Sequence, residues 1–348
     1  MKIKPPTPQP VPISGELYST YAWHPNVADD KILRVSKSSL GAFQTCEQQY
    51  FIKYVLGVKE PQNDNMLRGT NVHDAYEYIM DRNLEERGFD GVLNIEYATK
   101  IKEEQGFDGV RGYFESLIPL AQISKGWHDE YATPTGEDYS LGEQEHLSRL
   151  MDAEAKRFMD SNPDSFKPVG NELGVNALVE LDINGTKVQV HLNGFIDRLF
   201  MDDNGDYHVH ELKTGLWKDK KMKYDSMAKE MAFYVYMLRK SSQLELGGVN
   251  ISYWGWDHTK GIEGKPNEIY RFIEPVKAGV VADMLTDLKA LVSAHLRYKG
   301  DFNGKMFATK PVGAERYFCQ PWCAVKGFCP KYERHMMPHE MRDKAEGN

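Results

Sequence analysis

Cysteine is scarce in this chain, and long apolar runs are absent. Four cysteines in 348 residues are too few for the disulfide framework of a small secreted domain, and they favour a reducing compartment. No stretch reaches the roughly 20 apolar residues that a membrane-spanning helix needs, and the N-terminus lacks the basic and apolar pattern of a secretory signal. We therefore expect a cytoplasmic protein, from a bacterial, archaeal or phage-infected cell, with no membrane partner.

Positive charge is also scarce. The chain has 43 lysines and arginines against 51 aspartates and glutamates, a formal net charge of −8, which argues against a protein that coats nucleic acid without discrimination. One local exception is a run of lysines that follows Glu211: Lys213, Lys218, Lys220, Lys221 and Lys223. This run indicates either a basic path for a polyanion or a solvated loop or helix face.

Internal repeats are absent as well, and so is the Gly-x-x-x-x-Gly-Lys-Ser/Thr loop that cradles the phosphates of a nucleotide. The hydrophobic content of 41% and the charged content of 27% are those of a soluble globular protein. We divide the chain into five predicted regions: a Pro-rich arm (1–34), N-terminal helices (35–83), a helical insertion (84–165), a core (166–300) and a C-terminal cysteine segment (301–348).

Strand patterns dominate the predicted core. The turns Asn184-Gly185-Thr186 and Asp202–Asp206 each separate two strand-like segments, which predicts two hairpins. Helices are predicted to begin at Ser36 and after Arg68. The other predicted elements are strands at 177–183, 187–192, 194–201, 207–213 and 249–256 and helices at 224–240 and 275–298. A meander of strands followed by helix, strand and helix indicates an α/β fold with a central sheet flanked by helices.

The four cysteines are divided unequally between the two ends of the chain. Cys46 stands alone, whereas Cys319, Cys323 and Cys329 form a C-x3-C-x5-C run. Four thiolates are a ligand set for a metal site, which would join the N- and C-terminal segments as a clasp. Zinc prefers two short ligand pairs, whereas one remote ligand suits a [4Fe–4S] cluster. Four free buried thiols are the third interpretation.

Two acids and a lysine lie around the second predicted hairpin. Asp197 lies near the start of one strand and Glu211 near the end of the paired strand, so the hairpin brings the two carboxylates face to face. Because side chains alternate along a strand, Glu211 and Lys213 share one face while Leu212 points into the core. The carboxylates and the Leu212 carbonyl are oxygen ligands for Mg²⁺ or Mn²⁺, and Lys213 would steer water or stabilise charge on a phosphate. The pattern predicts metal-dependent phosphodiester hydrolysis, whereas an isolated Glu-x-Lys would be a solvated surface.

The order of these residues resembles a known family. Gly194-Phe195-Ile196-Asp197, followed by Glu211-Leu212-Lys213-Thr214-Gly215, is similar to the GxID…(D/E)xKTG pattern of the RecB-type branch of the PD-(D/E)xK nuclease superfamily. The resemblance implies a restriction-endonuclease-like mixed sheet and a Mg²⁺- or Mn²⁺-dependent deoxyribonuclease, more an exonuclease than an endonuclease, that acts on single-stranded DNA ends. The implied partners are DNA and a helicase or recombination protein, in DNA repair or recombination.

Further site residues follow from the same resemblance. Gly69-Thr70-Asn71-Val72-His73 matches a Gly-x-x-x-His helix motif, so His73 is implied as a third metal ligand, the other interpretation being a buried structural histidine. The family's Gln-x-x-x-Tyr motif aligns with Glu230 to Tyr234, where the tyrosine matches and a carboxylate replaces the amide. Glu230 would position a water molecule, and Tyr234 would support the substrate or the site. Glu172 stands where some members carry an additional acid.

An iron–sulfur subset of this branch carries one cysteine before the histidine helix and three after the last core helix. The subset includes the CRISPR-associated exonucleases, the AddB helicase–nuclease and exonuclease V, and Cys46, Cys319, Cys323 and Cys329 match its order. The usual C-terminal spacing is C-x2-C-x5-C, so this chain has one extra residue in the first gap. The resemblance covers residues 35–335, apart from the 84–165 insertion, and implies a structural [4Fe–4S] clasp. The alternative function is a catalytically weak DNA-binding or adaptor component of a recombination or CRISPR-adaptation complex.

Two groups of aromatic residues have two interpretations each. One group would stack nucleic-acid bases or pack in the core: Trp217, Trp254 and Trp256. The other group, among the C-terminal cysteines, would shield a cluster from solvent or belong to a plain core: Phe318, Trp322 and Phe328.

Overall fold

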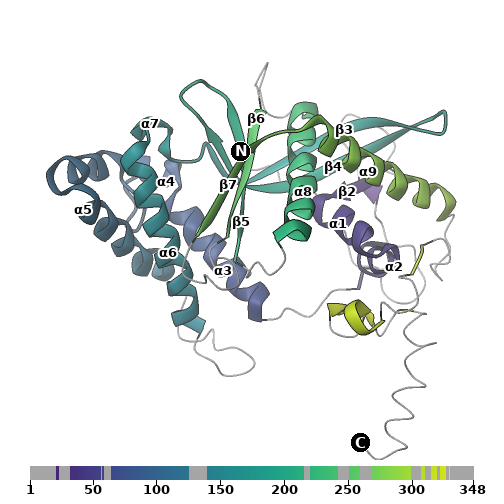
Figure 1. The fold of residues 1–348 in the computed structure, drawn as a ribbon, viewed down its shortest axis with the longest axis horizontal. Helices are drawn as coiled ribbons and strands as arrows, with labels where there is room; N and C mark the ends of the chain where they lie inside the picture. Colours follow the sequence, from purple (N-terminus) through teal and green to yellow (C-terminus); the bar gives the residue numbers. More distant parts are fainter. Residues whose placement is uncertain are drawn as a thin grey trace, which may run out of the picture.

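A seven-stranded mixed sheet lies at the centre of the part of the chain that the computed structural model describes (Figure 1). The described residues are 21–22, 32–55, 57–58, 64–124, 139–214, 220–241, 251–258, 269–298, 307–309, 315–319, 322–326 and 329. The strands are β1 (Tyr21–Ala22), β2 (Ile32–Ser36), β3 (Gly170–Ile183), β4 (Thr186–Met201), β5 (Tyr207–Lys213), β6 (Ile251–His258) and β7 (Tyr270–Pro275). The helices are α1 (Lys37–Thr45), α2 (Glu47–Tyr50), α3 (Asp64–Ile79), α4 (Arg82–Glu86), α5 (Ile95–Ser124), α6 (Tyr139–Asp160), α7 (Pro163–Phe166), α8 (Lys220–Lys240) and α9 (Ala278–Tyr298), with π-helical turns at Phe51–Val55 and Glu315–Cys319.

The long strand β4 organises this sheet. It pairs antiparallel with β3 over almost its whole length. On its other edge, the middle of β4 pairs in parallel with β2, and its last residues pair antiparallel with β5. β5 then pairs in parallel with β6, and β6 pairs antiparallel with β7. The result is the mixed sheet flanked by helices that the sequence predicts (Figure 1).

Two short turns connect β3, β4 and β5. Asn184 and Gly185 have φ angles of 52° and 83°, the left-handed values that a two-residue hairpin turn of type I′ requires. In the second turn, Oδ1 of Asp202 accepts hydrogen bonds from the backbone N–H groups of Asn204 and Asp206, at 2.9 and 3.0 Å. Both hairpins form where the sequence predicts them, and they fix the register of the three strands.

The observed strands differ from the predicted ones in number and extent. The predicted strands 187–192 and 194–201 form the single strand β4, which continues through Gly194 past the ring of Tyr234, 3.3 Å from where a Cβ would lie. Asp197 therefore lies near the end of a strand, not near the start of one. β2 and β7 were not predicted, because strands of five and six residues are too short for a clear alternating pattern. β2 also begins inside the segment 1–34 that was predicted as an arm.

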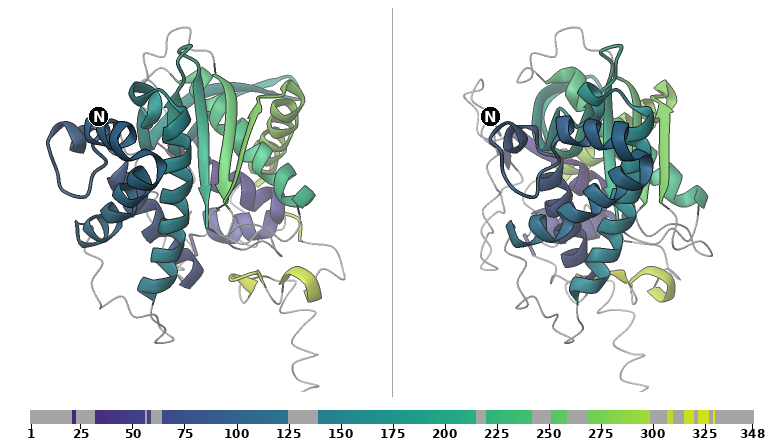
Figure 2. Two further views of the ribbon diagram at one scale, coloured as in Figure 1. Left: turned by 60° about the vertical axis from the view of Figure 1, so that its left-hand side comes forward. Right: turned by 90° about the vertical axis from the view of Figure 1, so that its left-hand side faces the viewer.

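One hydrophobic core lies between the sheet and the helices α1, α8 and α9 (Figures 1 and 2). α8 contributes buried residues at helical spacing, including Met231, Val235 and Leu238, which pack over β3, β4, β5 and β6. Trp254 of β6 is 1% exposed and belongs to this core, so it packs against its neighbours and does not stack on nucleic-acid bases.

A second core holds together α3, α5 and α6, which form the helical subdomain (Figure 2, left). Tyr76 of α3, Phe114 of α5 and Phe158 of α6 are buried there, and Leu212 of β5 closes the core against the sheet. Because α3 packs against α5 and α6 in the same core that contains Leu212 of β5, this second core fixes the position of His73 relative to β5. The predicted bounds of the five regions stay predictions.

The N-terminal helices pack against a segment near the C-terminal end of the described chain. The backbone N–H of Gln48 donates to the Ala308 carbonyl at 3.0 Å, and the Ala308 N–H donates to Glu47 Oε2 at 2.8 Å. The rings of Phe51 and Phe307 are stacked, with centroids 5.1 Å apart. These contacts already hold the two ends of the fold together beside Cys46.

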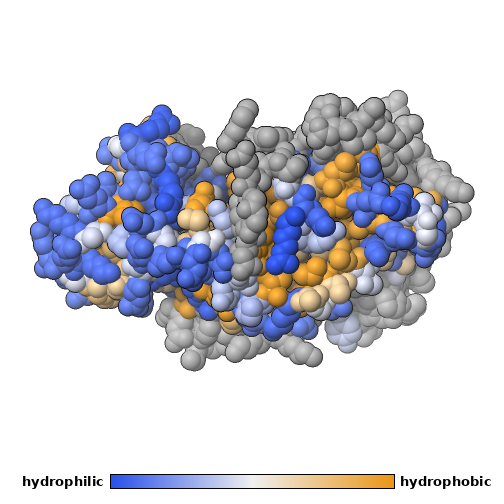
Figure 3. Space-filling model, turned by 90° about the horizontal axis from the view of Figure 1, so that it is seen from above, coloured by the Kyte–Doolittle hydropathy of each residue, from blue (hydrophilic) through white to orange (hydrophobic). Residues whose placement is uncertain are grey.

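One face of the helical subdomain is largely polar. In Figure 3, hydrophilic residues cover the end of the molecule at left, whereas apolar residues gather toward the middle. Among the helices in the described ranges, none combines the length and the apolar character needed to cross a membrane.

Candidate metal and active site

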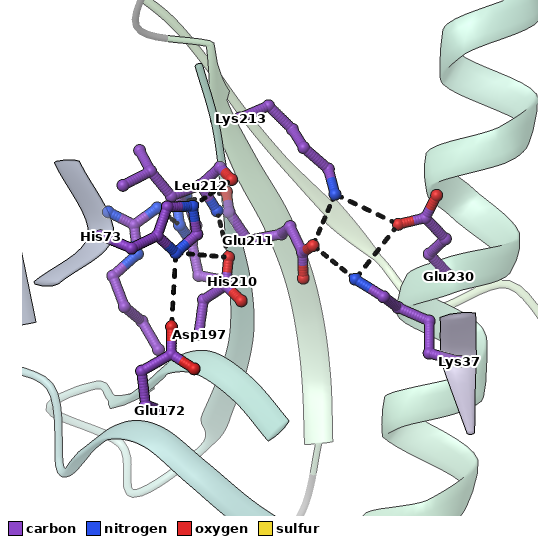
Figure 4. A network of polar contacts seen from close by, with 10 residues as sticks. Lys37, His73, Glu172, Asp197, His210, Glu211, Leu212, Lys213 and Glu230 are labelled. Carbon is purple, nitrogen blue, oxygen red and sulfur yellow. Dashed lines mark hydrogen bonds and ion pairs between the residues drawn. The ribbon is translucent and has the colours of Figure 1, made fainter. Parts of the chain in front are cut away.

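Polar side chains from six helices and strands gather around β4 and β5 in two adjoining groups (Figure 4). The histidine group contains one residue each from α3, β3 and β4: His73, Glu172 and Asp197. The lysine group contains residues of α1, β5 and α8: Lys37, Glu211, Lys213 and Glu230. Asp197 and Glu211 are the acids through which the two groups meet.

The histidine group brings three ligand atoms together. Nδ1 of His73 lies 3.3 Å from Glu172 Oε1 and 3.7 Å from Asp197 Oδ2, and one ligand atom from each residue lies within 4.8 Å of the others. Nε2 of His73 lies 3.0 Å from the Leu212 carbonyl oxygen. A hydrogen bond donated there leaves the Nδ1 lone pair for a metal ion, the usual arrangement for a ligating histidine. Two carboxylates and one imidazole fit a small divalent cation.

The backbone at Glu172 is unusual. Its φ angle is 43°, in the left-handed region that costs a residue other than glycine about 1–3 kcal/mol. The neighbouring pairs Asn171–Arg198 and Leu173–Ile196 hold the residue in place on both sides. The ladder between β3 and β4 thus keeps a strained glutamate directed at His73.

Asp197 lies at the centre of the site, with 12% of its side chain exposed. Its Oδ2 accepts a hydrogen bond from the Leu212 backbone N–H at 2.8 Å. Burial, followed by the charge of Glu211, raises the pKa of Asp197 to about 6. Burial acts to lower the pKa of His73, but the hydrogen bond to Glu172 and the charge of Asp197 raise that pKa overall. A divalent cation would relieve the repulsion between the two acids, because an opposite charge favours their ionised forms.

Glu211 is 3% exposed and has two very different oxygens. Oε1 accepts hydrogen bonds from the ammonium groups of Lys37 and Lys213, each at 2.6 Å. Burial acts to raise the pKa of Glu211, but the two lysines outweigh burial and lower that pKa. Oε2 is buried and has no hydrogen-bond partner among the described residues. Because a buried unpaired polar atom is costly, this oxygen is a second place where a cation fits.

The predicted residues Glu230 and Tyr234 of α8 both face the lysine group. Glu230 Oε2 lies 3.3 Å from Lys213 Nζ and 3.4 Å from Lys37 Nζ. Tyr234 is buried, its pKa is raised by that burial, and Lys37 Nζ lies 5.2 Å from the centre of its ring. Burial acts to lower the pKa values of Lys37 and Lys213, but the charge of Glu211 raises both above the usual lysine value, so both lysines are cations in the site.

Sequence reasoning missed Lys37 and Arg198. Lys37 is the first residue of α1, where a cation opposes the helix dipole, and this misfit is the signal that points to it. Arg198 is 2% exposed and donates to the Glu211 carbonyl at 3.2 Å, with its Nη2 also 2.6 Å from His210 Nδ1. It lies over the ring of Tyr76 and fixes the backbone of β5, but no motif marks it.

All four cysteines are free thiols. Cys46 lies between α1 and α2, and Cys319 ends a π-helical turn. Burial raises the pKa of Cys323 to about 11, and the charges of Cys46, Cys319 and Cys329 contribute to that rise. The remote N-terminal thiol therefore lies within electrostatic range of Cys323, as do the other two C-terminal thiols.

The aromatic residues around these cysteines differ in exposure. Trp322 is 75% exposed, so it does not shield the thiols, whereas Phe318 packs against the first core. Several side chains named in the sequence interpretation lie outside the described residues: Trp217, Lys218, Lys220, Lys221, Lys223, Trp256 and Phe328.

Comparisons with known proteins place the chain among nucleases. A family model for the PD-(D/E)XK nuclease superfamily matches residues 34–330. Over 225 residues the chain is 24% identical to a component of the ATP-dependent helicase/deoxyribonuclease of Streptococcus agalactiae serotype Ia, and the match covers 62% of this chain but 17% of that protein. A solved structure from Eubacterium rectale, assigned as an exonuclease, aligns with 12% identity and a TM-score of 0.35 over 81% of this chain and 91% of its own. SSO0001 aligns with 14% identity and a TM-score of 0.29 over 76% and 95%.

Proposed function

The chain belongs to the PD-(D/E)XK nuclease superfamily, and on that basis we propose that it is a Mg²⁺- or Mn²⁺-dependent exonuclease of single-stranded DNA ends, stabilised by a [4Fe–4S] cluster. The observation that carries the proposal is the meeting of the histidine and lysine groups at two acids, the partly buried Asp197 and the buried Glu211. Asp197 and Glu211 repel each other, while Glu211 Oε2 is buried without a hydrogen-bond partner among the described residues. A cation between the two carboxylates would reduce their repulsion and give Glu211 Oε2 a partner.

The proposed metal ligands are His73, Glu172, Asp197 and Glu211, with the Leu212 carbonyl as a further oxygen. A bound Mg²⁺ or Mn²⁺ would supply the positive charge that polarises a phosphodiester and the water that attacks it. The hydrogen bond between His73 Nε2 and the Leu212 carbonyl would hold the imidazole with Nδ1 toward the acids.

Lys213 has the proposed role of stabilising charge on the phosphate and orienting the attacking water. Its ammonium lies between Glu211 and Glu230, at 2.6 and 3.3 Å, so both contacts direct it into the site. Glu230 would position that water by accepting a hydrogen bond from it, and the buried ring of Tyr234 would support the substrate or the site. A preorganised cation of this kind stabilises developing negative charge more strongly in a buried site than in water.

The proposed cluster ligands are Cys46, Cys319, Cys323 and Cys329. Support comes from the electrostatic influence of the other three thiols on Cys323 and from the backbone bond between Gln48 and Ala308, which joins the same two segments. A cluster there would be a structural clasp between the N- and C-terminal segments, because the free energy of metal binding contributes directly to folding. The name of the streptococcal relative supports, as a proposal only, a helicase partner that supplies single-stranded ends in recombination or repair.

The choice of substrate gives a direct test. With Mn²⁺ present, we expect linear single-stranded DNA to be degraded progressively, while circular single-stranded DNA of the same sequence stays intact. Labels at the 5′ and 3′ ends, followed on denaturing gels, report the shortening. Nicking of the circle would identify an endonuclease. Binding of both substrates without cleavage would favour the DNA-binding or adaptor function instead.

Glu172 gives a second test that concerns metal binding alone. We expect Glu172→Gln to weaken Mn²⁺ binding about tenfold or more, because a neutral amide replaces one of the carboxylates of the group. Calorimetric titration of the metal-free protein with Mn²⁺ measures the change. Glu180→Gln changes an exposed glutamate on the same strand that is paired with Lys187, and it is the matched control. Equal Mn²⁺ affinity in both variants would remove Glu172 from the ligand set.

A further inference from the structure

Lys37 occupies a position that local structure does not explain. It opens α1, whose first turn contains no acidic residue, and a cation at a helix N-terminus is unfavourable by about 0.3–1 kcal/mol. The neighbouring Ser36 and Ser39 form the capping box that begins the helix. The helix therefore starts without help from Lys37, and the reason for a lysine lies in the site.

Two lysines contact Glu211, although one ammonium group would balance the charge of its carboxylate. Lys37 and Lys213 contact the same oxygen of Glu211, each at 2.6 Å, and the charge of Lys37 acts to lower the pKa of Lys213. Two ammonium groups on one carboxylate oxygen repel each other, and this repulsion offsets part of their attraction to the acid. Glu230 takes up the excess charge, at 3.4 Å from Lys37.

A hollow of about 520 Å³ adjoins this pair of lysines. It lies between α1 and the N-terminal half of α8, and Lys37, Lys213 and Lys229 face it together with the acids Asp225 and Glu230. Lys229 is paired with Asp287 at 2.7 Å, so its charge is already compensated. The side chain of Lys37 is 17% exposed and lines the hollow. Its ammonium points toward Glu211 and Glu230 (Figure 4) and lies 5.2 Å from the centre of the Tyr234 ring.

We propose that Lys37 binds a phosphate of the nucleic-acid strand in this hollow, and that Glu230 is its counter-ion while the site holds no nucleic acid. The proposal rests on the nuclease function above and assigns the α1–α8 side of the site to the backbone of the substrate. A phosphate oxygen replaces the weaker and longer contact with Glu230, while the 2.6 Å bond to Glu211 holds the ammonium in place. Charge-assisted bonds to phosphate fix the position of a strand without reading its sequence.

Salt-dependent binding tests the proposal. Asp197→Asn is the parent, so that bound single-stranded DNA is not cut, and fluorescence anisotropy of a labelled oligonucleotide gives Kd between 50 and 200 mM salt. In this parent, Lys37→Met is expected to weaken binding about tenfold and to reduce the slope of log K against log salt by about 0.7, the value for one phosphate on a single strand. Lys37→Arg should keep the parent slope, and Glu230→Gln should tighten binding about twofold to threefold because Lys37 loses its competing acid.

The controls separate this inference from its premise and from misfolding. Lys187→Met removes an exposed lysine from the β3–β4 hairpin, 74% exposed and paired with Glu180, and is expected to change neither Kd nor slope. If Lys37→Met lowers Tm but leaves the slope of log K against log salt unchanged, Lys37 has a purely structural role. That result would overturn the inference about Lys37 and leave the proposed function in place. If the Asp197→Asn parent itself binds no single-stranded DNA, the proposed function fails first.

Discussion

Asp197→Asn is expected to reduce metal-dependent cleavage of single-stranded DNA by about a thousandfold or more. Asp197 belongs to the histidine group, 3.7 Å from His73 and bonded to the Leu212 N–H, and its charge also acts on Glu211 of the lysine group. Loss of several kcal/mol of charge stabilisation corresponds to about three powers of ten in rate. Initial rates on an end-labelled oligonucleotide, measured across Mn²⁺ concentrations, give the change.

The same substitution should leave the fold intact. Because the pKa of Asp197 is raised to about 6, its ionised form is less favourable in the folded than in the unfolded chain at neutral pH. A neutral asparagine removes that cost and still accepts the Leu212 hydrogen bond, so the Tm of the metal-free protein is expected to stay the same or rise. Asp108→Asn, on an exposed part of α5, is the matched control with full activity. If Asp197→Asn keeps activity near the level of the control, the proposed metal-dependent cleavage at this site is wrong.

The sequence predicted those parts of the fold that local patterns encode. The turn at Asn184 and Gly185 and the one closed by Asp202 depend on residues within each turn, so both hairpins were predicted in place. β4 was divided in two because Gly194 resembles a break, whereas its role is to let Tyr234 of α8 approach the strand. That contact joins residues distant in the chain, which a periodic pattern cannot report.

The candidate site divides in the same way. His73, Asp197, Glu211 and Lys213 lie in short motifs, and the structure brings each of them to one place. Glu172 gave only a weak signal, since its importance comes from a left-handed backbone, φ 43°, that its neighbours on β4 impose. Sequence also paired Asp197 with Glu211 in a single pocket, whereas the side chains form two groups that meet at these acids (Figure 4).

Cys46→Ser is expected to abolish the proposed iron–sulfur cluster. Cys46 is the only cysteine in the N-terminal part of the chain, so no other thiol there can replace it and the clasp would lose its N-terminal attachment. Anaerobically purified protein should lose the broad absorbance near ~400 nm that thiolate–iron clusters show, together with its bound iron. Because metal binding contributes to folding, Tm should fall by about 5 °C or more. Protease should also cut the segment around Cys319 faster.

Thr45→Ala is the matched control for that change. Thr45 precedes Cys46, is exposed, and its hydroxyl donates to the Gly41 carbonyl within α1, so the variant should keep the absorbance, the iron and the Tm. If the wild-type protein contains bound zinc and has no absorbance in the visible range, the four cysteines form a zinc site and not an iron–sulfur cluster. Equal Tm and protease resistance in Cys46→Ser and Thr45→Ala would show that contacts such as Phe51 on Phe307 hold the two ends together without any metal.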